Sequence, residues 1–270
     1  MNLGYINFLN CYPFYYHMFE KQPLERVTIL PDYPGRLNAL LTAGQTDMSP
    51  ISAATCANLQ DEIFILPEFC LSSVGYIGSV TLAAHCPIEE LDGKTVGVTN
   101  ASHTSAVLLK ILLKRYYQAA PVYITTPPRP EMTGLDAALL IGNDAMVKAA
   151  RPLPYMYDLG DLWLRKTGFP VVFAVFAARR TALDTLSEQV RAVVDSYHRS
   201  LACLQQEREA VIAGARTKYP DILYDIGGYY DLFRFDFTDD LKRALLFYFA
   251  QAADLDLLPP VRQLEYLTLR

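Results

Sequence analysis

The sequence predicts an α/β fold with two lobes and a ligand cleft between them. Short apolar segments typical of strands alternate with segments typical of helices along the 270 residues, and this alternation favours mostly parallel sheets. Residues 86–170 form a self-contained run of such elements, flanked by apolar strands at residues 74–84 and 171–178. We expect these two strands to cross between the lobes. The expected limits are residues 1–83 with 177–270 for the first lobe and 84–176 for the second.

Apolar alternation predicts the strands of the N-terminal region, and apolar faces at helical spacing predict its helices. In chain order we expect a strand at 3–8, a helix to about 19, a strand at 27–30, a helix at 35–43, a strand at 47–51, a helix start at 52–59 and a strand at 63–66. The helix at 35–43 carries Leu37, Leu40 and Leu41 on one face and ends at Gly44, a residue that favours helix C-termini.

The rest of the chain continues the alternation. We expect strands at 95–98, 122–125, 135–141 and 171–178, helices at 104–117 and 182–206, and helical segments near 239–253 and 260–266. A regular apolar stripe that includes Val190, Val193 and Tyr197 supports the long helix at 182–206.

The charge balance argues against several classes of partner. With 24 Lys and Arg against 29 Asp and Glu, the formal charge is −5 and the sequence pI is about 5.4. Sequence-independent binding to nucleic acid or to an anionic membrane needs a basic excess instead. No run of about 18 or more apolar residues predicts a membrane span. The residues after Met1 lack the basic and apolar regions of a secretory signal, so we expect a cytoplasmic protein.

Residue types that bind metals or form covalent intermediates are scattered. The five cysteines include no C-x-x-C pair, and the four histidines show no zinc-ligand spacing. There is no G-x-S-x-G nucleophile motif and no lysine at a turn that suggests an imine. We therefore expect reduced thiols, and metal, acyl-enzyme and imine chemistry all lack support in the sequence. The remaining chemistry is the binding of a small anion by hydroxyls, amides and helix N-termini, with a simple proton transfer.

Polar residues at the ends of the predicted strands are candidates for such a site. Asn10 directly follows the first strand, where its amide either orients a hydroxyl or carboxylate or caps the next helix. Ser49 and Ser52 lie where a strand ends and a helix begins, which suits an anion, although Ser52 also fits a simple N-cap. Ser79 interrupts the apolar strand at 74–84 and either is satisfied locally or faces the cleft.

The strongest pattern for anion binding is the segment 99–105, where six of seven residues are polar and an apolar helix follows. Backbone N–H groups at a helix N-terminus favour a carboxylate or a phosphate. Thr104 and Ser105 are the candidate ligands, and His103 is a candidate acid or base that equally fits an exposed position. The segment lacks the glycines of a nucleotide-binding loop, which argues against nucleotides.

A carboxylate also follows the strand predicted at 135–141. Asn143 and Asp144 lie there at the start of a predicted helix. Asp144 is the carboxylate best placed to act as a general base, and N-capping of the helix is an equally good role for it. We count Asn143 among the candidate substrate-binding residues.

The ordered set of these segments resembles a known family. The opening LGYINFLNCYP at residues 3–13 is similar to the start of the chorismate dehydratases of menaquinone biosynthesis. The likeness continues through residues 47–52, 91–93, 104–105, 141–145 and 158–175. The C-terminal helices resemble the family only in their pattern.

The resemblance implies a two-lobed fold like that of type II periplasmic binding proteins, used here as an enzyme. It implies the removal of water from chorismate to give 3-[(1-carboxyvinyl)oxy]benzoate in the futalosine pathway, with no metal and no organic cofactor. The asparagine and the serine that match Asn10 and Ser79 lie at the substrate in such enzymes. Where this chain has Asn143 the family more often has aspartate, followed by an acidic residue that Asp144 preserves.

Chorismate is a dicarboxylate whose ring becomes aromatic when it loses water. The protein then needs to orient the ring, hold the carboxylates and help protons move. The expected roles are orientation of the ring by Asn10 and Ser79, binding of one carboxylate by Thr104 and Ser105, and lining of the cleft by Ser49 and Ser52. The general base is either Asp144 or a carboxylate of the substrate.

Two alternatives share the predicted fold. A sister enzyme of the same pathway acts on dehypoxanthine futalosine and has the same two-lobed plan. Its sequence after the matching proline usually turns rich in leucine and glycine, unlike the VVFAVF at residues 171–176. A non-catalytic small-anion binding protein would be stabilised by its ligand without turnover. The sequence does not give the oligomeric state.

Overall fold

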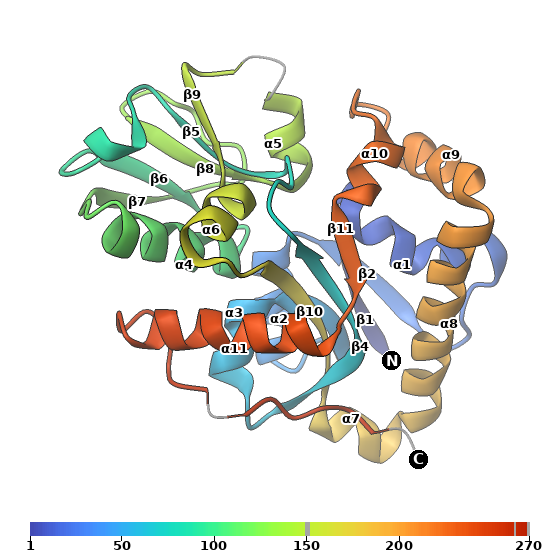
Figure 1. The fold of residues 1–270 in the computed structure, drawn as a ribbon. Coiled ribbons are helices and arrows are strands. Elements are labelled where there is room, and N and C mark those ends of the chain that lie inside the picture. Colours follow the sequence, from blue (N-terminus) through green and yellow to red (C-terminus); the bar gives the residue numbers. More distant parts are fainter. Residues whose placement is uncertain (149–151, 262, 269–270) are drawn as a thin grey trace.

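The structure is a computed structural model that describes residues 1–148, 152–261 and 263–268. These residues form two β-sheets, one of six strands in the order β11-β4-β10-β3-β1-β2 and one of five in the order β7-β6-β8-β5-β9. Figure 1 shows each sheet with its own helices, and connecting segments that pass between the two. The predicted two-lobed α/β fold is confirmed.

The first sheet collects strands from both ends of the chain. Its strands are β1 Asn2–Ile6, β2 Thr28–Asp32, β3 Met48–Ser52, β4 Ile63–Ser73, β10 Val171–Arg179 and β11 Phe233–Asp236. β1 pairs in parallel with β2 and β3, whereas β10 runs antiparallel to β3 and β4. Every residue of β3 is buried, as expected for a strand with neighbours on both edges and helices over it.

The second sheet forms from one continuous part of the chain. Its strands are β5 Val80–Ala84, β6 Thr95–Thr99, β7 Val122–Thr126, β8 Ala137–Ile141 and β9 Tyr155–Asp158. β6 is parallel to β7 and β8, and β5 is antiparallel to β8 and β9. The accompanying helices are η3 Ile88–Glu90, α4 His103–Ile111 with its continuation η4 Leu112–Tyr116, α5 Gly142–Lys148 and α6 Leu159–Thr167.

The remaining helices surround the first sheet. They are η1 Leu9–Cys11, α1 Tyr12–Tyr16, η2 His17–Lys21, α2 Pro34–Thr42, α3 Ala53–Leu59, α7 Arg180–Thr185, α8 Ser187–Gln206, α9 Arg208–Lys218, α10 Ile226–Asp231 and α11 Asp239–Ala253. Phe14 of α1 and Tyr197 of α8 pack with Phe69 and Phe176 of the sheet, with ring centroids 4.3–6.1 Å apart. Each such aromatic pair contributes about 0.5–1.5 kcal/mol beyond its buried area, so the cluster fixes both helices on the sheet.

Two connections carry the chain between the sheets. It passes from β4 to β5 and returns through the segment between α6 and β10. Gly160 of α6 lies against the first connection, because a Cβ at this position would lie 2.3 Å from the Gly75 carbonyl oxygen. The lobe limits predicted near residues 83 and 176 fall inside β5 and β10, the strands that these connections enter.

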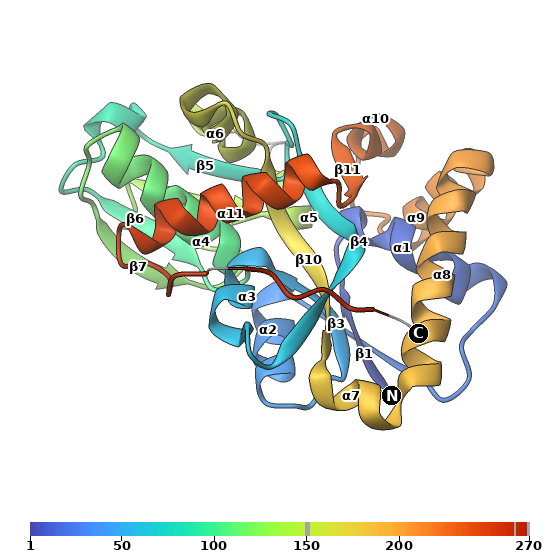
Figure 2. The ribbon, with the colours of Figure 1, turned by 60° about the horizontal axis from the view of Figure 1, so that its bottom comes forward.

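Helix α11 packs against both lobes, although it comes from the C-terminal part of the chain (Figure 2). Phe247 of this helix stacks on Phe169 at 4.1 Å, next to the return connection. The Tyr248 hydroxyl donates to the Thr104 carbonyl oxygen of α4 at 3.2 Å. Trp163 of α6 packs against the rings of Phe247 and Tyr248 of α11. The first residues of α4 are therefore supported by the C-terminal helix.

The structure corrects the predicted strand pattern around the first connection. Both sheets are mixed rather than mostly parallel, because β10 and β5 run opposite to their neighbours. Residues 74–79 form the connection itself, and only residues 80–84 of the strand predicted there are extended in the sheet. The strand predicted at 63–66 continues to Ser73. Pro67 does not end it, because it lies where the pairing with β10 changes register and no ladder N–H is needed.

The C-terminal predictions are correct in part. The helix predicted at 182–206 is divided into α7 and α8, and the one near 239–253 is confirmed as α11. The helix predicted at 260–266 includes residue 262, which lies outside the described residues. The other residues of that segment are not helical, and Tyr266 instead forms a bridge with Ile65 of β4.

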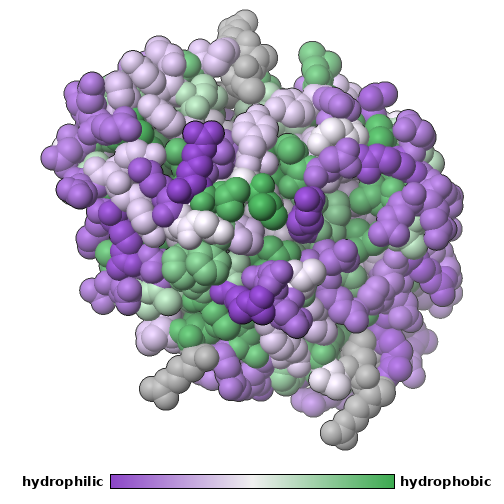
Figure 3. Space-filling model, in the orientation of Figure 1, coloured by the Kyte–Doolittle hydropathy of each residue, from purple (hydrophilic) through white to green (hydrophobic). Residues whose placement is uncertain are grey.

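The face in Figure 3 carries hydrophobic side chains near its middle, where the connections of Figure 1 pass between the sheets. Val74 and Tyr76 of the first connection are 54% and 52% exposed. No helix among the described residues is both long and apolar enough to cross a membrane.

Candidate functional site

A cavity of about 40 Å³ lies between the two sheets, and we call it the inner cavity. The polar residues that line it are Asn10, Ser52, Ser79, Ser102 and Ser105. Asn10 follows β1 and Ser52 ends β3 in the first sheet, whereas Ser79 precedes β5 and the other two serines begin α4. The rest of the wall is apolar and includes Phe8, Phe173 and Phe233. The inner cavity is thus a small apolar space with polar groups from both lobes.

Asn10 and Ser79 are joined by a tyrosine that the sequence does not single out. The Tyr229 hydroxyl donates to Ser79 Oγ at 2.7 Å, and the Asn10 side chain is hydrogen-bonded to the same phenol. Asn10 Oδ1 is buried and has no hydrogen-bond partner among the described residues. A buried acceptor left unpaired costs about 1–3 kcal/mol, so a ligand that donates to this oxygen recovers that free energy.

The serines on the opposite side surround the N-terminus of α4. Ser102 is the N-cap, and its Oγ accepts the Ser105 N–H at 3.3 Å and donates to Ser105 Oγ at 3.0 Å. From the other lobe, Ser52 Oγ accepts the His103 N–H at 3.2 Å. The helix N-terminus favours negative charge, so these serine oxygens occupy positions that carboxylate oxygens suit.

The connection that carries Ser79 is held by backbone hydrogen bonds. Asp158 accepts the Ile77 N–H at 3.1 Å and the Gly78 N–H at 2.6 Å, and the Ser79 carbonyl oxygen accepts the Gly142 N–H at 2.7 Å. Burial raises the pKa of the Asp158 carboxyl above its usual range, although these and other backbone N–H groups lower it in part. Ser79 is therefore placed by α5 and by the start of α6.

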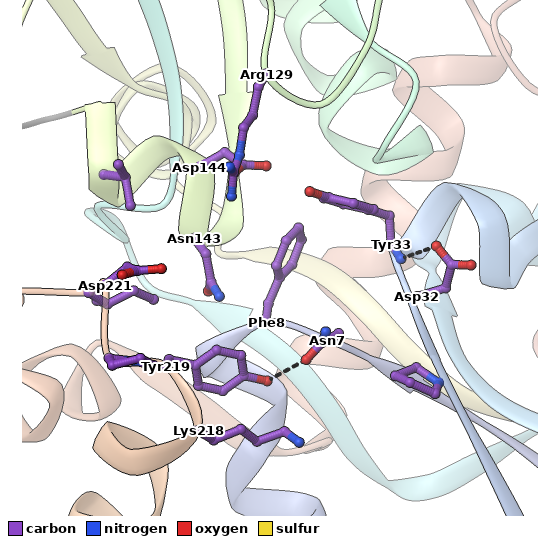
Figure 4. A pocket seen from close by; sticks show the side chains of 14 residues that line it. Asn7, Phe8, Asp32, Tyr33, Arg129, Asn143, Asp144, Lys218, Tyr219 and Asp221 are labelled. Atoms are coloured by element: carbon purple, nitrogen blue, oxygen red, sulfur yellow. Dashed lines mark hydrogen bonds and ion pairs between the residues drawn. The ribbon is translucent and has the colours of Figure 1, made fainter.

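A larger pocket of about 510 Å³ lies beside the inner cavity, and Phe8 lines both spaces. We call it the outer pocket, and Figure 4 shows its side chains. Arg129 pairs with the buried carboxylate of Asp144 at 2.5 Å, and the two side chains lie together above Phe8 in Figure 4. Asn143 Oδ1 accepts the Leu9 N–H at 2.9 Å, which joins the start of α5 to η1 across the lobes.

The two spaces differ in charge. Among the described residues, no ionisable side chain lines the inner cavity. The outer pocket is lined by three aspartates and two basic residues, which are Asp32, Asp144, Asp221, Arg129 and Lys218. Proton transfer in the inner cavity therefore has to use hydroxyls, amides or groups of the ligand itself. No group of three or more His, Cys, Asp or Glu residues in the described chain could hold a metal ion.

The structure brings together only part of the predicted site. Four of the predicted residues line the inner cavity, namely Asn10, Ser52, Ser79 and Ser105. Asn143 and Asp144 line the outer pocket instead, because the positive φ of Gly142 starts α5 in a direction that carries its first turn past Phe8. His103 also lies outside the inner cavity, and its Nδ1 is 3.3 Å from Thr55 Oγ1.

Ser49 and Thr104 do not line the inner cavity, although both were expected in the cleft. Ser49 is buried within β3, where its Oγ donates to the Pro50 carbonyl oxygen at 2.8 Å. Gly4 of β1 leaves the space for this serine, because a Cβ there would lie 2.1 Å from Ser49 Oγ. Thr104 Oγ1 donates to the Phe173 carbonyl oxygen at 2.8 Å. The Thr104 hydroxyl thus joins α4 to β10, whereas the Ser49 hydroxyl is bonded within its own strand.

Two polar residues were missed as candidates, namely Ser102, which lines the inner cavity, and Tyr229, which is hydrogen-bonded to the lining residue Ser79. Ser102 belongs to the polar segment at 99–105, and its position three residues before Ser105 fits an N-cap that bonds to the first turn. That spacing was a signal in the sequence. Tyr229 lies in α10, in a region that resembles the family only in pattern, and no local motif marks it.

The partly buried position of His103 leads to a prediction about pH. Burial, and to a smaller extent the charge of Lys110, lower the pKa of the His103 imidazole. The unfolded chain then takes up a proton first as the pH falls through about 6.5, so folding stability is lost on acidification. We expect the free energy of unfolding of His103→Gln to fall less than that of the wild type between about pH 7 and pH 5. One such group contributes at most about 1.4 kcal/mol per pH unit.

Urea unfolding at a series of pH values measures this difference. Above about pH 7.5, where the imidazole is neutral in both states, the two stability curves should run parallel. Curves that stay parallel down to about pH 5 would show that burial does not perturb this histidine.

Most of the chain matches known proteins in sequence, and all of it does so in fold. Residues 1–254 match a family model described as menaquinone biosynthesis. The chorismate dehydratase of Thermus thermophilus is 33% identical over 195 residues, which cover 66% of this chain and 69% of that protein. A 1,4-dihydroxy-6-naphthoate synthase of the same organism is 25% identical over 87% of this chain and 86% of that protein. The periplasmic aliphatic sulphonate binding protein of Escherichia coli shares the fold, with a TM-score of 0.66, 14% identity, and coverage of 100% of this chain and 94% of that one.

Proposed function

The chain belongs to the menaquinone-biosynthesis family, and we propose that within this family it is a chorismate dehydratase. The proposed reaction removes water from chorismate and gives 3-[(1-carboxyvinyl)oxy]benzoate, so the enzyme is a hydro-lyase. The observation that carries the proposal is that Asn10 and Ser79 meet in one cavity, opposite the N-terminus of α4. The 33% identity to the Thermus thermophilus chorismate dehydratase supports the same conclusion.

The reaction requires the protein mainly to position the substrate. Loss of the hydrogen at C3 and the hydroxyl at C4 makes the ring of chorismate aromatic, so the driving force lies in the substrate. We assign one carboxylate to the N-terminus of α4, where Ser102 and Ser105 supply hydroxyls. This carboxylate replaces Ser52 Oγ as the acceptor of the His103 N–H. Asn10 and Ser79 then face the ring hydroxyl and hold it for departure.

The general base is better sought in the substrate than in the protein. The inner cavity is lined by no ionisable side chain among the described residues, and Asp144 is buried in an ion pair with Arg129 in the outer pocket. A carboxylate of chorismate would take the proton from C3. The electrons of that C–H bond would form the new ring double bond as the C4–O bond breaks. The departing hydroxyl would take the proton back from the carboxylate and leave as water. Under this proposal Asp144→Asn keeps most of its turnover.

Incubation of the purified protein with chorismate tests the proposal. Mass spectrometry should detect a protein-dependent product that is lighter than chorismate by one water molecule. The reaction needs no added metal or cofactor under this proposal. If chorismate raises the melting temperature without turnover, the protein is a binding protein and the proposed activity is wrong.

A second candidate is the formation of 1,4-dihydroxy-6-naphthoate, because a synthase with that name matches a larger share of the chain at lower identity. The same preparation distinguishes the two candidates. Neither turnover nor stabilisation with chorismate, together with turnover of a futalosine-derived substrate, would favour the second.

A further inference from the structure

Tyr229 occupies a position from which it controls both polar residues that face the proposed ring hydroxyl. It belongs to α10, near the C-terminal end of the chain, and is 1% exposed. Its hydroxyl donates to Ser79 Oγ at 2.7 Å, and Ser79 is equally buried. The ring packs edge-on against Phe233 at 5.0 Å, so the phenol has little freedom to turn away.

The direction of these hydrogen bonds determines what the inner cavity offers a ligand. A phenol has one hydrogen, and Tyr229 uses it on Ser79. The hydrogen bond that joins Asn10 to the same phenol must therefore be donated by the Asn10 amide. Two groups therefore remain available to a ligand. The Ser79 hydroxyl keeps its own hydrogen to donate, and Asn10 Oδ1 keeps its lone pairs to accept.

Burial keeps the hydrogen of this bond on the phenol. It raises the pKa of the Tyr229 phenol above its ordinary value. The phenol therefore stays protonated throughout the neutral range and keeps the hydrogen that it donates to Ser79.

Resting on the proposed function, we propose that Tyr229 is a positioning residue, which fixes Ser79 as a hydrogen-bond donor and Asn10 as a hydrogen-bond acceptor toward the leaving hydroxyl of the substrate. A hydroxyl both donates and accepts, so it matches this pair. The donor matters more as the C4–O bond breaks, since negative charge then grows on the departing oxygen. A donor already aimed at that oxygen stabilises the transition state more than the bound substrate.

The test is Tyr229→Phe, which removes the hydroxyl and keeps the ring. Tyr197→Phe is the matched control, because Tyr197 is also fully buried and its hydroxyl also donates to another hydroxyl at 2.7 Å, that of Tyr15, in the core of the first lobe. We expect kcat for chorismate to fall about 10- to 100-fold in Tyr229→Phe, with KM within about threefold of the wild type. Tyr197→Phe should lose similar thermal stability and keep its kcat.

A double mutant separates positioning from a general loss of structure. If Tyr229 acts through Ser79, the change Tyr229→Phe should have little further effect on kcat in a Ser79→Ala background. Effects that multiply in the double mutant would overturn the inference, and so would a Tyr229→Phe variant as active as Tyr197→Phe. Absence of turnover by the wild-type protein would overturn the proposed function, and this inference with it. Turnover by the wild type with either of the first two results overturns the inference alone.

Discussion

Replacing Asn10 with alanine is expected to lower kcat/KM for chorismate by about 100-fold. Asn10 Oδ1 is buried without a partner in the described structure, so it is available to accept from the substrate hydroxyl. Alanine removes this acceptor and also the amide that bonds to Tyr229. Steady-state kinetics with chorismate measure the loss. Urea unfolding should show a stability cost of no more than about 1–2 kcal/mol, because one hydrogen bond within the protein is lost.

Asn7→Ala is the control for this variant, because it removes the same side chain three residues earlier. Asn7 lines the outer pocket, where its Oδ1 accepts the Tyr219 hydroxyl at 3.0 Å. We expect its kcat/KM to stay within about threefold of the wild type. If Asn7→Ala proved as damaging as Asn10→Ala, or if Asn10→Ala kept wild-type activity, the reaction could not take place in the inner cavity.

The fold was largely predictable because its signals are local. Alternation of short strands and helices, and one self-contained middle block, lead directly to two lobes. The errors arise where tertiary pairing overrides a local signal. Pro67 reads as the end of a strand, but a change of register lets β4 continue through it to Ser73. The segment around Tyr266 has a helical pattern but pairs with Ile65 instead.

The sequence predicts which strand ends form the site, but it does not predict which side chains at those ends face the cavity. Strands of both sheets end at the inner cavity, so residues that follow or end these strands, such as Asn10, Ser52 and Ser105, line it together. Which hydroxyl of a polar segment enters the cavity depends on one residue of helical rotation. Thr104 turns toward the Phe173 carbonyl, whereas Ser105 faces the cavity. No pattern in the sequence indicates which of these two hydroxyls faces the cavity.

Tyr229 shows a second kind of limit. It lies 150 residues from Ser79 in the chain, and its partner is chosen by the packing of α10 against the first connection. A single tyrosine among 18 carries no signal for such a contact. A residue that completes a site from a distant part of the chain can be identified only when the fold is known.

The inner cavity is too small for the proposed substrate in the arrangement described. About 40 Å³ is room for a few water molecules at most, not for a ring with two carboxylates. Ser52 also accepts the His103 N–H that a carboxylate would use, so the lobes meet across the site. Substrate entry must therefore separate the polar walls or move an apolar side chain. Phe8 lines both the inner cavity and the outer pocket, so its position determines whether the two spaces stay separate.

Gly142→Ala is expected to destabilise the protein by about 2–4 kcal/mol and to lower kcat/KM at least tenfold. A Cβ at this position would lie 2.5 Å from the Phe8 ring, and the backbone has φ +57°, which an alanine adopts only under strain. The Gly142 N–H also holds the Ser79 carbonyl oxygen at 2.7 Å. Displacement of either element therefore disturbs both walls of the inner cavity. Urea unfolding and steady-state kinetics measure the two effects.

Gly168→Ala separates backbone strain from the contact with Phe8. Gly168 ends α6 with φ +76°, and a Cβ there would have no neighbour within 4 Å. Its substitution should therefore cost only the strain of a left-handed alanine, about 1 kcal/mol, and leave kcat/KM near that of the wild type. A Gly142→Ala variant no less stable than Gly168→Ala would mean that Phe8 yields freely and is not a fixed wall of the cavity. Loss of activity confined to Gly142→Ala would instead place the Phe8 ring and the Ser79 connection in one unit, whose geometry the reaction requires.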